Sequence, residues 1–502
     1  NKMNLKFSTT FKNTIYQVMI ERGWTDIGES NDYDFAWLTK EEVQATYDQR
    51  RSQAVKSWVN HFANHQQLSR KDLLAQNVQK QLRALQKINH PQAESFRTIP
   101  TTFILPENYA AFQRYASERS TSEMNHPLSP QRVKMQNVSH STAKSRKELR
   151  TIPPKPIPQE SKIPRVDDLQ KLKQPLSKIS RNSSRDDFSK QDDSFAQEVK
   201  DQSQKFIIKP ACLLQGQGIF IATAEEIRTW YQTTYPQIVR QATQFDQKAA
   251  EAIFAQYKRR GINISREAIG SQFKSGHDLY LIQKYIENPL LINGHKFDCR
   301  VYVLVRSFKP LQVWVCNEGF ARFALTQYSA DFSQQAAHLT NVAIQKTADN
   351  YDPQGEGAKW SMFQLFQRIR LQFGPRKSKQ CQENMETTIL RVLQSVYQLE
   401  PVDQRAFEVY GFDVMLTDQL EAQVCEVNAC PSLTADTQDD LLVKKRMLHD
   451  ALSLTVGGVD KEVFGCFHAI FNGQVDQEDF DKGRVRTGVL LGDRVERGGL
   501  MM

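Results

Sequence analysis

The segment KFDCRVYVLVRSF, residues 296–308, constrains the fold more than any other stretch of this chain. Successive side chains of a β-strand point to opposite faces, so Lys296, Asp298, Arg300 and Tyr302 would share one face. The strand continues into VYVLV, which is apolar on both faces, so its charged half should lie at the rim of a buried sheet. Charges there need partners or a ligand, although a strand with a simple solvated face would show the same pattern.

A second pair of strands is predicted near the end of the chain. YGFDVML (410–416) and AQVCEVNACPSL (422–433) are joined by TDQLE, which is short enough for a hairpin. If the faces of the two strands align, Asp413, Glu426 and Asn428 converge. Two carboxylates and an amide are hard oxygen ligands of the kind that Mg²⁺ prefers. The pattern favours a metal site over the alternative, a hairpin with a polar outer face.

The segment FIIKPACLLQGQGIFIA, residues 206–222, places a Lys-Pro pair and a glycine-rich bend between two apolar runs. Gly216 and Gly218 have no Cβ and would let the backbone approach a ligand closely. Lys209 ends the first run and could reach the phosphate charge of that ligand. A glycine hairpin with a surface lysine explains the same residues, so this segment alone does not decide the question.

Three further segments are informative only in combination. LIQKYIENP (281–289) has strand character before a proline stop, and a role of its backbone in binding an adenine edge rests only on the resemblance described below. GFARF (319–323) and HLTNVAIQK (338–346) add cations and short polar side chains. Each of these two would otherwise indicate a helix cap or a surface loop.

Length and composition bound the class of protein. A chain of 502 residues with 39% hydrophobic and 10% aromatic residues is typical of a globular protein with two or three folded units. No stretch approaches the roughly 20 apolar residues that span a bilayer, and the first residues show no signal-peptide pattern. The net charge of +9 suggests an acidic partner. Nucleic acid has little support as that partner, because no basic stripe with stacking aromatics is present.

The cysteines indicate a reducing compartment. The seven cysteines are an odd number, are dispersed, and include no C-x-x-C spacing, which favours free thiols over structural zinc. They are Cys212, Cys299, Cys316, Cys381, Cys425, Cys430 and Cys466.

Residues 5–117 are predicted to be folded. The aromatic-rich segment Arg22–Leu38 predicts strand, turn, strand, and residues 68–85 show the three- and four-residue apolar spacing of a helix. Ser69 followed by Asp72 predicts a capping arrangement at its start. IPTTFILP, residues 99–106, predicts a short strand bounded by prolines.

The composition changes at about residue 117. Residues 117–204 are rich in Ser, Pro, Lys, Arg and Asp and have almost no apolar periodicity, which predicts a mostly disordered insertion within the fold. Its basic stretches could touch an acidic partner or could simply be solvated. Between 205 and about 455, strands and helices alternate and several strands are adjacent in sequence. This pattern predicts an α+β fold with antiparallel sheet.

These segments, taken together and in order, resemble the tubulin tyrosine ligase-like family of ATP-grasp ligases. The resemblance covers about residues 205–435 and is carried by K-P…Q-G-x-G-I, Q-K-Y-I-E-N-P, K-F-D-x-R-V-Y-V-L-V, G-F-A-R-F, H-L-T-N-V-A-I-Q-K, Y-G-F-D and E-V-N-A-x-P-S-L. RGW at 22–24 and HFANHQQLSRKDLL at 61–74 also look like that family's N-terminal domain. The branch that this chain most resembles is that of the shorter members regarded as tubulin polyglutamylases.

The resemblance implies an α+β ATP-grasp fold, in which two mixed or antiparallel sheet lobes sandwich ATP, with a smaller N-terminal α/β domain. The implied division is an N-terminal domain at 1–117, the basic Pro/Ser-rich insertion at 118–204, a central ATP-grasp lobe at 205–290, a C-terminal catalytic lobe at 291–455 and a C-terminal extension at 456–502.

The resemblance also assigns the site residues. Mg²⁺ would be held by Asp413, Glu426 and Asn428. Arg300 would stabilise charge on the transferred phosphoryl group, while Arg322 and Lys359 would grip the carboxylates of the incoming amino acid. The residues expected to bind ATP are Lys209, Gln215, Gly216, Gln283, Lys284, Tyr285, Ile286, Lys296, Phe297, Asp298, Thr340 and Asn341.

The implied function is ATP-dependent addition of glutamate to the acidic tails of tubulin through an acyl-phosphate intermediate. The expected cofactors are ATP and Mg²⁺. The expected partners are tubulin or microtubules, free L-glutamate and accessory subunits of a polyglutamylase complex. The expected location is the cytoplasm and cytoskeleton, including the axoneme or basal body of a cilium or flagellum.

Some positions depart from the family pattern. Leu214 and Gln217 stand where relatives usually carry a polar and a basic residue, which would weaken the grip on phosphate. The cysteines at 299, 425 and 430 replace aliphatic or small residues. Two alternatives therefore stay open, a catalytically weak structural member bound to microtubules or axonemes, and a ligase of glycine or tyrosine. No principal charged position is lost, so an active enzyme is predicted.

Overall fold

The computed structural model describes residues 4–28, 30, 32–52, 57–123, 204–213, 216–259, 276–345, 359–435 and 437–473. All of them belong to one folded unit of the chain. The described part combines helices with three separate sheets, so the predicted α+β class is confirmed.

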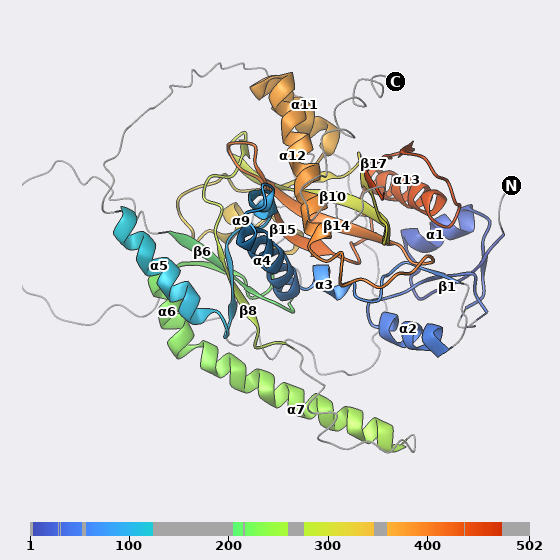
Figure 1. Ribbon diagram of the computed structural model, residues 1–502, viewed down its shortest axis with the longest axis horizontal. Coiled ribbons are helices and arrows are strands. Elements are labelled where there is room, and N and C mark those ends of the chain that lie inside the picture. The colour runs from blue at the N-terminus through green and yellow to red at the C-terminus, as the bar shows by residue number, and fades with distance from the viewer. Residues whose placement is uncertain are drawn as a thin grey trace, which may run out of the picture. The chain divides into compact units, whose positions relative to one another are not determined.

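A nine-stranded antiparallel sheet carries most of the charged segments identified in the sequence (Figure 1). Its long central strand is β10 (His295–Phe308), which pairs with β9, β11, β12 and β14. The strand predicted at 296–308 and the hairpin predicted at 410–433 are both confirmed. The other strands are β9 (Leu291–Ile292), β11 (Leu311–Cys316), β12 (Phe320–Phe323), β13 (Lys359–Ser361), β14 (Glu408–Leu416), β15 (Ala422–Asn428), β16 (Val463–Phe464) and β17 (Phe467–Asn472).

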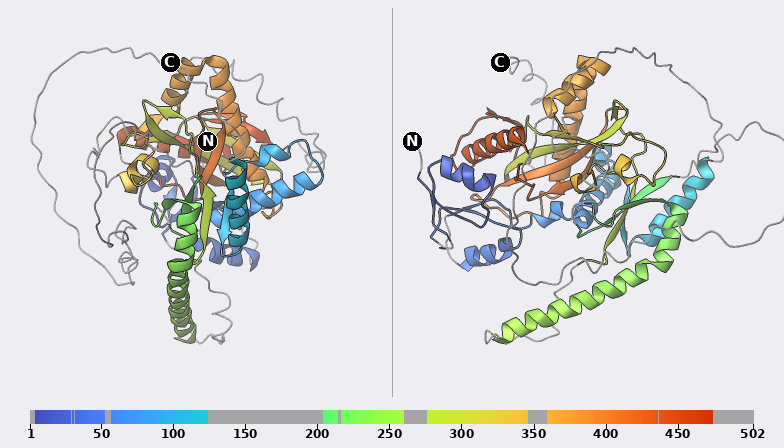
Figure 2. Two further views of the ribbon diagram at one scale, coloured as in Figure 1. Left: turned by 90° about the vertical axis from the view of Figure 1, so that its left-hand side faces the viewer. Right: turned by 180° about the vertical axis from the view of Figure 1, so that it is seen from behind.

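Helices cover both faces of this sheet. α11 and α12 lie side by side, joined by Gly374 (Figures 1 and 2). The helices that do not alternate with the strands of the two four-stranded sheets described below are α3 (Gln66–Ser69), α4 (Lys71–Lys87), the 3₁₀ turn η1 (Ala93–Phe96), α9 (Gln335–His338), α10 (Val342–Gln345), α11 (Met362–Phe373), α12 (Pro375–Gln394) and α13 (Gln438–Leu454). Within the part of the chain that is described, no helix is both long and apolar enough to cross a membrane.

The side chains of β10 alternate between two cores. Val301, Val303 and Val305 are buried in a large cluster with residues of α4 and α12. Tyr302 and Leu304 face the opposite way, into a second cluster with residues of α13 and of the N-terminal segment. Residues 296, 298 and 300 are an even number of positions from Tyr302, so these charged side chains lie on the same face of β10. They continue that face past the part that the second cluster covers.

The N-terminal segment forms a small parallel sheet in the order β2-β1-β3-β4. Both strands predicted within Arg22–Leu38 form, but they pair on either side of β1 and not with each other. The elements are β1 (Lys6–Thr9), α1 (Thr14–Glu21), β2 (Thr25–Asp26), β3 (Phe35–Trp37), α2 (Glu42–Ser52) and β4 (Trp58–Val59).

The third sheet has four antiparallel strands in the order β5-β8-β6-β7. β5 is the strand predicted at 99–106, and it pairs with β8 although it lies within the segment 1–117 that was expected to form a separate domain. The elements are β5 (Thr102–Leu105), α5 (Tyr109–Glu123), β6 (Lys205–Pro210), β7 (Phe220–Thr223), α6 (Ala224–Thr233), α7 (Tyr235–Arg259) and β8 (Tyr280–Lys284). The five-part division of the chain stays a prediction.

The predicted cap at Ser69 is wrong. α4 has Arg70 at its N-cap, without a side-chain capping bond, because Ser69 instead ends the short helix α3. Asp72 pairs with Arg70, and their Oδ2 and Nη2 atoms are 2.7 Å apart. The apolar spacing of this helix is confirmed, since Leu74, Val78 and Leu85 are buried.

Two predictions lie largely outside the described residues. The insertion at 118–204 is described only at its ends, where α5 continues to Glu123. Of the C-terminal extension, residues 456–473 are described, and they add β16 and β17 to the nine-stranded sheet beside β11.

Phe62 tests how strongly the N-terminal segment supports the main sheet. Its buried ring packs edge-on against Phe308 of β10, with ring centroids 5.0 Å apart. Phe62→Ala should lower the free energy of unfolding by about 3–5 kcal/mol, because it leaves a cavity in the large core. Chemical denaturation of the full chain measures this loss. Ile88→Ala, at an exposed position, is the control and should change the value by less than about 0.5 kcal/mol.

Candidate functional site

Two arginines and two aspartates form a buried network at the charged end of β10. Arg300 is directly opposite Asp413 of β14, and Asp298 is directly opposite Arg322 of β12. Arg300 donates from Nε to Asp413 Oδ1 (2.6 Å) and from Nη2 to Oδ2 (3.1 Å). Arg322 lies 2.9 Å from Asp413 Oδ2 and donates from Nε to Asp298 Oδ1 (3.0 Å). The sheet register therefore brings four of the predicted site residues into mutual contact.

The electrostatics of Asp413 follow from this network. Burial raises the pKa of a carboxyl group, but Arg300 and Arg322 outweigh burial here and lower the pKa of Asp413 to about 2. Asp413 is therefore ionised at neutral pH, and its negative charge is already shared between two cations.

The row of charges continues on both sides of the network. Glu426 of β15 is directly opposite Asp413, and Lys359 of β13 is directly opposite Arg322. Lys359 Nζ lies 3.8 Å from Oδ2 of the buried Asp440, which also pairs with Lys444. Five neighbouring strands, from β15 through β14, β10 and β12 to β13, thus present a continuous line of acidic and basic side chains.

The predicted metal ligands lie on neighbouring arms of one hairpin. Asp413 is opposite Glu426, and Asn428 is opposite Gly411, to whose carbonyl it donates at 3.3 Å. Strict alternation along β15 would predict that Val424, Glu426 and Asn428 share a face, and for Val424 this prediction is wrong. A bulge between Asp413 and Val414 changes the alternation, so Val424 is buried in the core.

These ligands fit a shared Mg²⁺ site. Among the described residues, no three His, Cys, Asp or Glu side chains are grouped closely enough to hold a metal by themselves. Two carboxylates and one amide would leave part of the coordination shell to phosphate oxygens and water, which is how Mg²⁺ is commonly bound. The chemistry of the donors therefore suits an ion that arrives with a nucleotide.

Lys209 and Gln283 lie on adjacent strands of the four-stranded sheet. Lys209 Nζ donates to Gln283 Oε1 (2.7 Å), and Gln283 Nε2 donates to Thr102 Oγ1 of β5 (2.9 Å). Burial lowers the pKa of Lys209, while the charges of Glu426 and Asp413 act to raise it. Lys209 therefore lies within electrostatic range of the hairpin that carries Asp413 and Glu426.

Lys296 joins the two predicted nucleotide-binding segments. Its Nζ donates to Tyr285 Oη (2.7 Å) and to the carbonyl of His338 (2.8 Å). Tyr285 Oη also lies 3.0 Å from His338 Nδ1. Phe297 points the other way, into the core beside Phe323, so only its backbone could face a nucleotide.

The glycine bend contacts the segment that contains Thr340 and Asn341. Gly216 has a φ of +80°, and a Cβ there would lie 2.7 Å from Ile344 Cδ1 and 3.3 Å from Asn341 Cγ. Thr340 and Asn341 directly precede α10. Gln215 and Leu214 lie outside the described residues.

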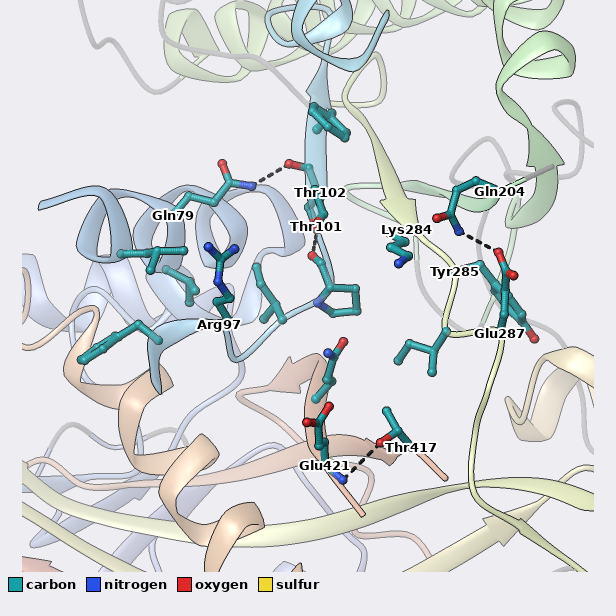
Figure 3. A pocket seen from close by; sticks show the side chains of 18 of the residues that line it. Gln79, Arg97, Thr101, Thr102, Gln204, Lys284, Tyr285, Glu287, Thr417 and Glu421 are labelled. Atoms are coloured by element: carbon teal, nitrogen blue, oxygen red, sulfur yellow. Dashed lines mark hydrogen bonds between the residues drawn. The ribbon is translucent and has the colours of Figure 1, made fainter. Parts of the chain in front are cut away.

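A cavity of about 700 Å³ lies beside residues 284–286, part of the segment predicted to bind adenine (Figure 3). Lys284, Tyr285 and Ile286 line it, together with residues of α4, β5 and the turn between β14 and β15. The other residues predicted to bind ATP do not line it. Of the residues predicted to bind ATP, the cavity therefore includes only residues 284–286, and no residue of the charged row lines it.

Sequence reasoning missed several residues that hold this site together. Lys71 of α4 lies 3.7 Å from Glu426 Oε1 and donates to the carbonyl of Leu213 at 3.1 Å. Its only sequence signal was its place at the start of a predicted helix. Cys430 Sγ lies 3.1 Å from His61 Nε2, and His61 Nδ1 lies 2.7 Å from Glu408 Oε1.

His61 and Glu408 form a fully buried pair. Burial opposes protonation of the imidazole, but Glu408 and Cys430 outweigh it and raise the pKa of His61 to about 10. The pair links the segment after β4 to β14 and, through Cys430, to the turn that follows Asn428. All seven cysteines are free thiols, as the sequence predicted.

Comparison with known proteins gives a consistent result. The model of the "Tubulin-tyrosine ligase family" matches residues 49–147 and 155–462. "Probable tubulin polyglutamylase ttll-9" of Caenorhabditis elegans is 28% identical over 467 residues, which cover 92% of this chain and 82% of that protein. "Probable tubulin polyglutamylase TTLL9" of Bos taurus is 27% identical over 95% of this chain and 86% of its own length. "Probable alpha-tubulin polyglutamylase Ttll1" of Tetrahymena thermophila is 25% identical over 90% and 86%.

The buried amine of Lys296 gives a pH-dependent prediction. Burial lowers the pKa of Lys296 from 10.5 to about 7. Between these two values the unfolded chain binds the proton and the folded chain does not, so Lys296 makes stability rise with pH in this window. From pH 7.5 to 9.0 the free energy of unfolding of the wild type should rise by about 1–2 kcal/mol relative to Lys296→Met.

Urea unfolding of both proteins at the two pH values measures this difference. Lys80→Met, at an exposed position on α4, controls for the loss of one positive charge. Parallel pH profiles for the wild type and Lys296→Met would contradict the assignment.

Proposed function

Because this chain belongs to the tubulin-tyrosine ligase family, we propose that it is an ATP-dependent ligase that adds glutamate to the acidic tails of tubulin. The names of its relatives, which are tubulin polyglutamylases, support this choice within the family. The observation that carries the proposal is the continuous row of charges across five strands, with the half-buried Lys209 of the other sheet close enough to interact electrostatically with Asp413 and Glu426.

In this proposal the nucleotide lies between the nine-stranded sheet and the four-stranded antiparallel sheet β5-β8-β6-β7. Lys209 and the Gly216 bend would contact phosphates, and the backbone of residues 283–286 would bind the adenine. Lys296 and Asp298, with Thr340 and Asn341, would complete the site, and Phe297 would contribute only its backbone. Gln215 stays a prediction from the resemblance.

Mg²⁺ would be held by Asp413, Glu426 and Asn428 and would offset charge between the phosphates and the attacking oxygen. The present partners of these two carboxylates are cations that an incoming phosphate would attract. Asp413 pairs with Arg300 and Arg322, and Glu426 pairs with Lys71. Arg300 is therefore suited to stabilise negative charge on the transferred phosphoryl group.

The chemistry would proceed in two steps. A carboxylate oxygen of the tubulin tail would attack the γ-phosphorus of ATP, ADP would leave, and an acyl phosphate would form. The amine of free glutamate would then attack the carbonyl carbon and lose a proton, inorganic phosphate would leave, and an isopeptide or peptide bond would form. The protein would orient the two substrates and neutralise charge through this row of side chains.

Arg322 and Lys359 would bind the two carboxylates of the incoming glutamate. They are cross-strand neighbours, so their positions relative to each other are fixed by the sheet. A donor with two carboxylates benefits from two cations, whereas glycine and tyrosine carry only one carboxylate. This difference favours glutamate over the other two amino acids.

The expected setting follows from the proposed substrate. Tubulin and microtubules would be the macromolecular partners, with L-glutamate as the small substrate and accessory subunits as further partners. The protein would act in the cytoplasm on the cytoskeleton, including the axoneme or basal body of a cilium or flagellum.

Loss of the metal ligands tests the ligase activity. The double variant Asp413→Ala, Glu426→Ala should lower incorporation of radiolabelled glutamate into microtubules with MgATP by about 100-fold or more, because the charge on the phosphates would no longer be offset. Asp418→Ala, in the exposed turn of the same hairpin, is the matched control and should keep wild-type activity.

Equal labelling by the wild type and the double variant would contradict the proposal. The assay should be run with isolated protein and with added cell extract, so that accessory subunits are present in one arm. Failure of the wild type to bind MgATP at millimolar concentration would instead favour the structural, catalytically weak member that Leu214 and Gln217 suggest.

Lys359 tests the choice of amino acid. Lys359→Ala should raise the KM for glutamate by about 10- to 100-fold, the value of a charge-assisted contact, with a much smaller change in the KM for ATP. Steady-state assays with each substrate varied separately measure both constants. Lys461→Ala, at an exposed position, is the control. Preferred incorporation of labelled glycine or tyrosine by the wild type would overturn the assignment of glutamate.

A further inference from the structure

The helix pair α11 and α12 is anchored next to the proposed active site. β13, which carries Lys359, leads directly into α11 through Ser361. Ser361 and Gln364 form a reciprocal capping box at the start of α11, so the first turn is fixed. Met362, Leu365 and Ile369 form the buried side of the helix.

The outer end of this pair is exposed. None of the eight residues from Arg370 to Lys377 is buried. α11 has 12 residues and is therefore about 18 Å long, at 1.5 Å per residue. The helix holds this exposed end, here called the tip, at a fixed distance of about 18 Å from the strand that carries Lys359.

The tip is strongly basic. Residues 361–382 contain no Asp or Glu. The cations on the outer parts of the two helices are Arg368, Arg370, Arg376, Lys377 and Lys379. Within the part of the chain that is described, no ion pair involves Arg370, Arg376 or Lys377, in contrast to the fully paired Arg300 and Arg322 of the site.

Two large apolar side chains accompany these cations. Phe363 is 70% exposed and Leu371 is 80% exposed. Phe363 and Arg370 are seven residues apart, almost two full turns, so they lie on the same side of α11. Leu371 lies at the tip next to Arg370 in sequence, about 100° around the helix from it. Exposed apolar side chains next to cations are typical of protein interfaces, where large apolar residues and arginine contribute most of the binding energy.

We propose that the tip of α11 and α12 docks on an acidic surface of the tubulin body while a tubulin tail occupies the active site. This rests on the proposed function, because that function supplies the acidic partner. Charge complementarity indicates which partner binds the tip. The proposed substrate carries carboxylates, and all the charged residues of the tip are cations. The rigid spacing between tip and Lys359 suits a partner that must be held by its body while a flexible tail reaches the charged row.

The test combines charge reversal with two substrates. The variant Arg370→Glu, Arg376→Glu, Lys377→Glu is compared with Lys80→Glu, Lys87→Glu, Arg240→Glu, which reverses three exposed cations on α4 and α7. Affinity is measured by co-sedimentation with stabilised microtubules, and kcat/KM is measured on a soluble acidic tail peptide. Thermal unfolding of both variants verifies that the fold is intact.

The tip variant should bind microtubules at least about tenfold more weakly than the wild type, with an unchanged kcat/KM on the peptide. The control variant should match the wild type in both assays. Leu371→Ser should also weaken microtubule binding while leaving the peptide reaction unchanged. Equal microtubule affinity of the tip variant and the control variant, or failure of the wild type to sediment with microtubules, would overturn the proposal.

A further arm separates protein from membrane. Vesicles of phosphatidylserine and phosphatidylcholine replace microtubules, and a loss of binding by the tip variant to vesicles but not to microtubules would overturn docking on tubulin. If the wild type modifies neither microtubules nor the peptide, the ligase proposal fails. Weaker sedimentation of the tip variant would still support the docking surface, so the two proposals fail separately.

Discussion

The pairing of Arg300 with Asp413 across β10 and β14 is the interaction on which the rest of the site depends. Both side chains are largely buried, and a buried charge is tolerated only when it is paired and hydrogen-bonded. A shift of one residue between these strands would turn the charged face of β10 into the apolar core. The strand register and the charge network therefore specify each other, and the positions of Asp298, Arg322, Glu426 and Lys359 follow from that register.

The two faces of β10 divide structural and chemical roles. Its odd-numbered residues from Phe297 to Val305 pack into the large core, so the strand is fixed over this length. Its even-numbered residues from 296 to 300 are charged, and the next two, Tyr302 and Leu304, belong to the second core together with residues of α13. One rigid strand thus anchors the site without using any of the site's own side chains for packing, which leaves these side chains available for charge chemistry.

The sequence predicted the local features well and the long-range partners poorly. Alternation within residues 296–308 and the short connection between β14 and β15 are local signals, so the strand, the hairpin and the opposition of Asp413 and Glu426 could be predicted. The pairing of β5 with β8, and the contacts of Lys71 with Glu426 and of His61 with Glu408, join segments that are far apart in sequence. No periodicity records such contacts. The bulge that turns the side chain of Val424 into the core also depends on the pairing of β15 with β14, and not on the sequence of β15 alone.

These long-range contacts indicate that residues of the N-terminal segment help to form the site and do not belong to an independent domain. β5 supplies Thr102 to the chain of hydrogen bonds through Gln283 to Lys209, and α4 supplies the cation next to Glu426. The carbonyl of Thr98 accepts a backbone hydrogen bond from Val424, beside the bulge in β15. His61, charged and buried against Glu408, reaches Cys430 two residues after Asn428. The geometry of the hairpin is thus determined from both sides, by β10 within the sheet and by residues 61–102 outside it.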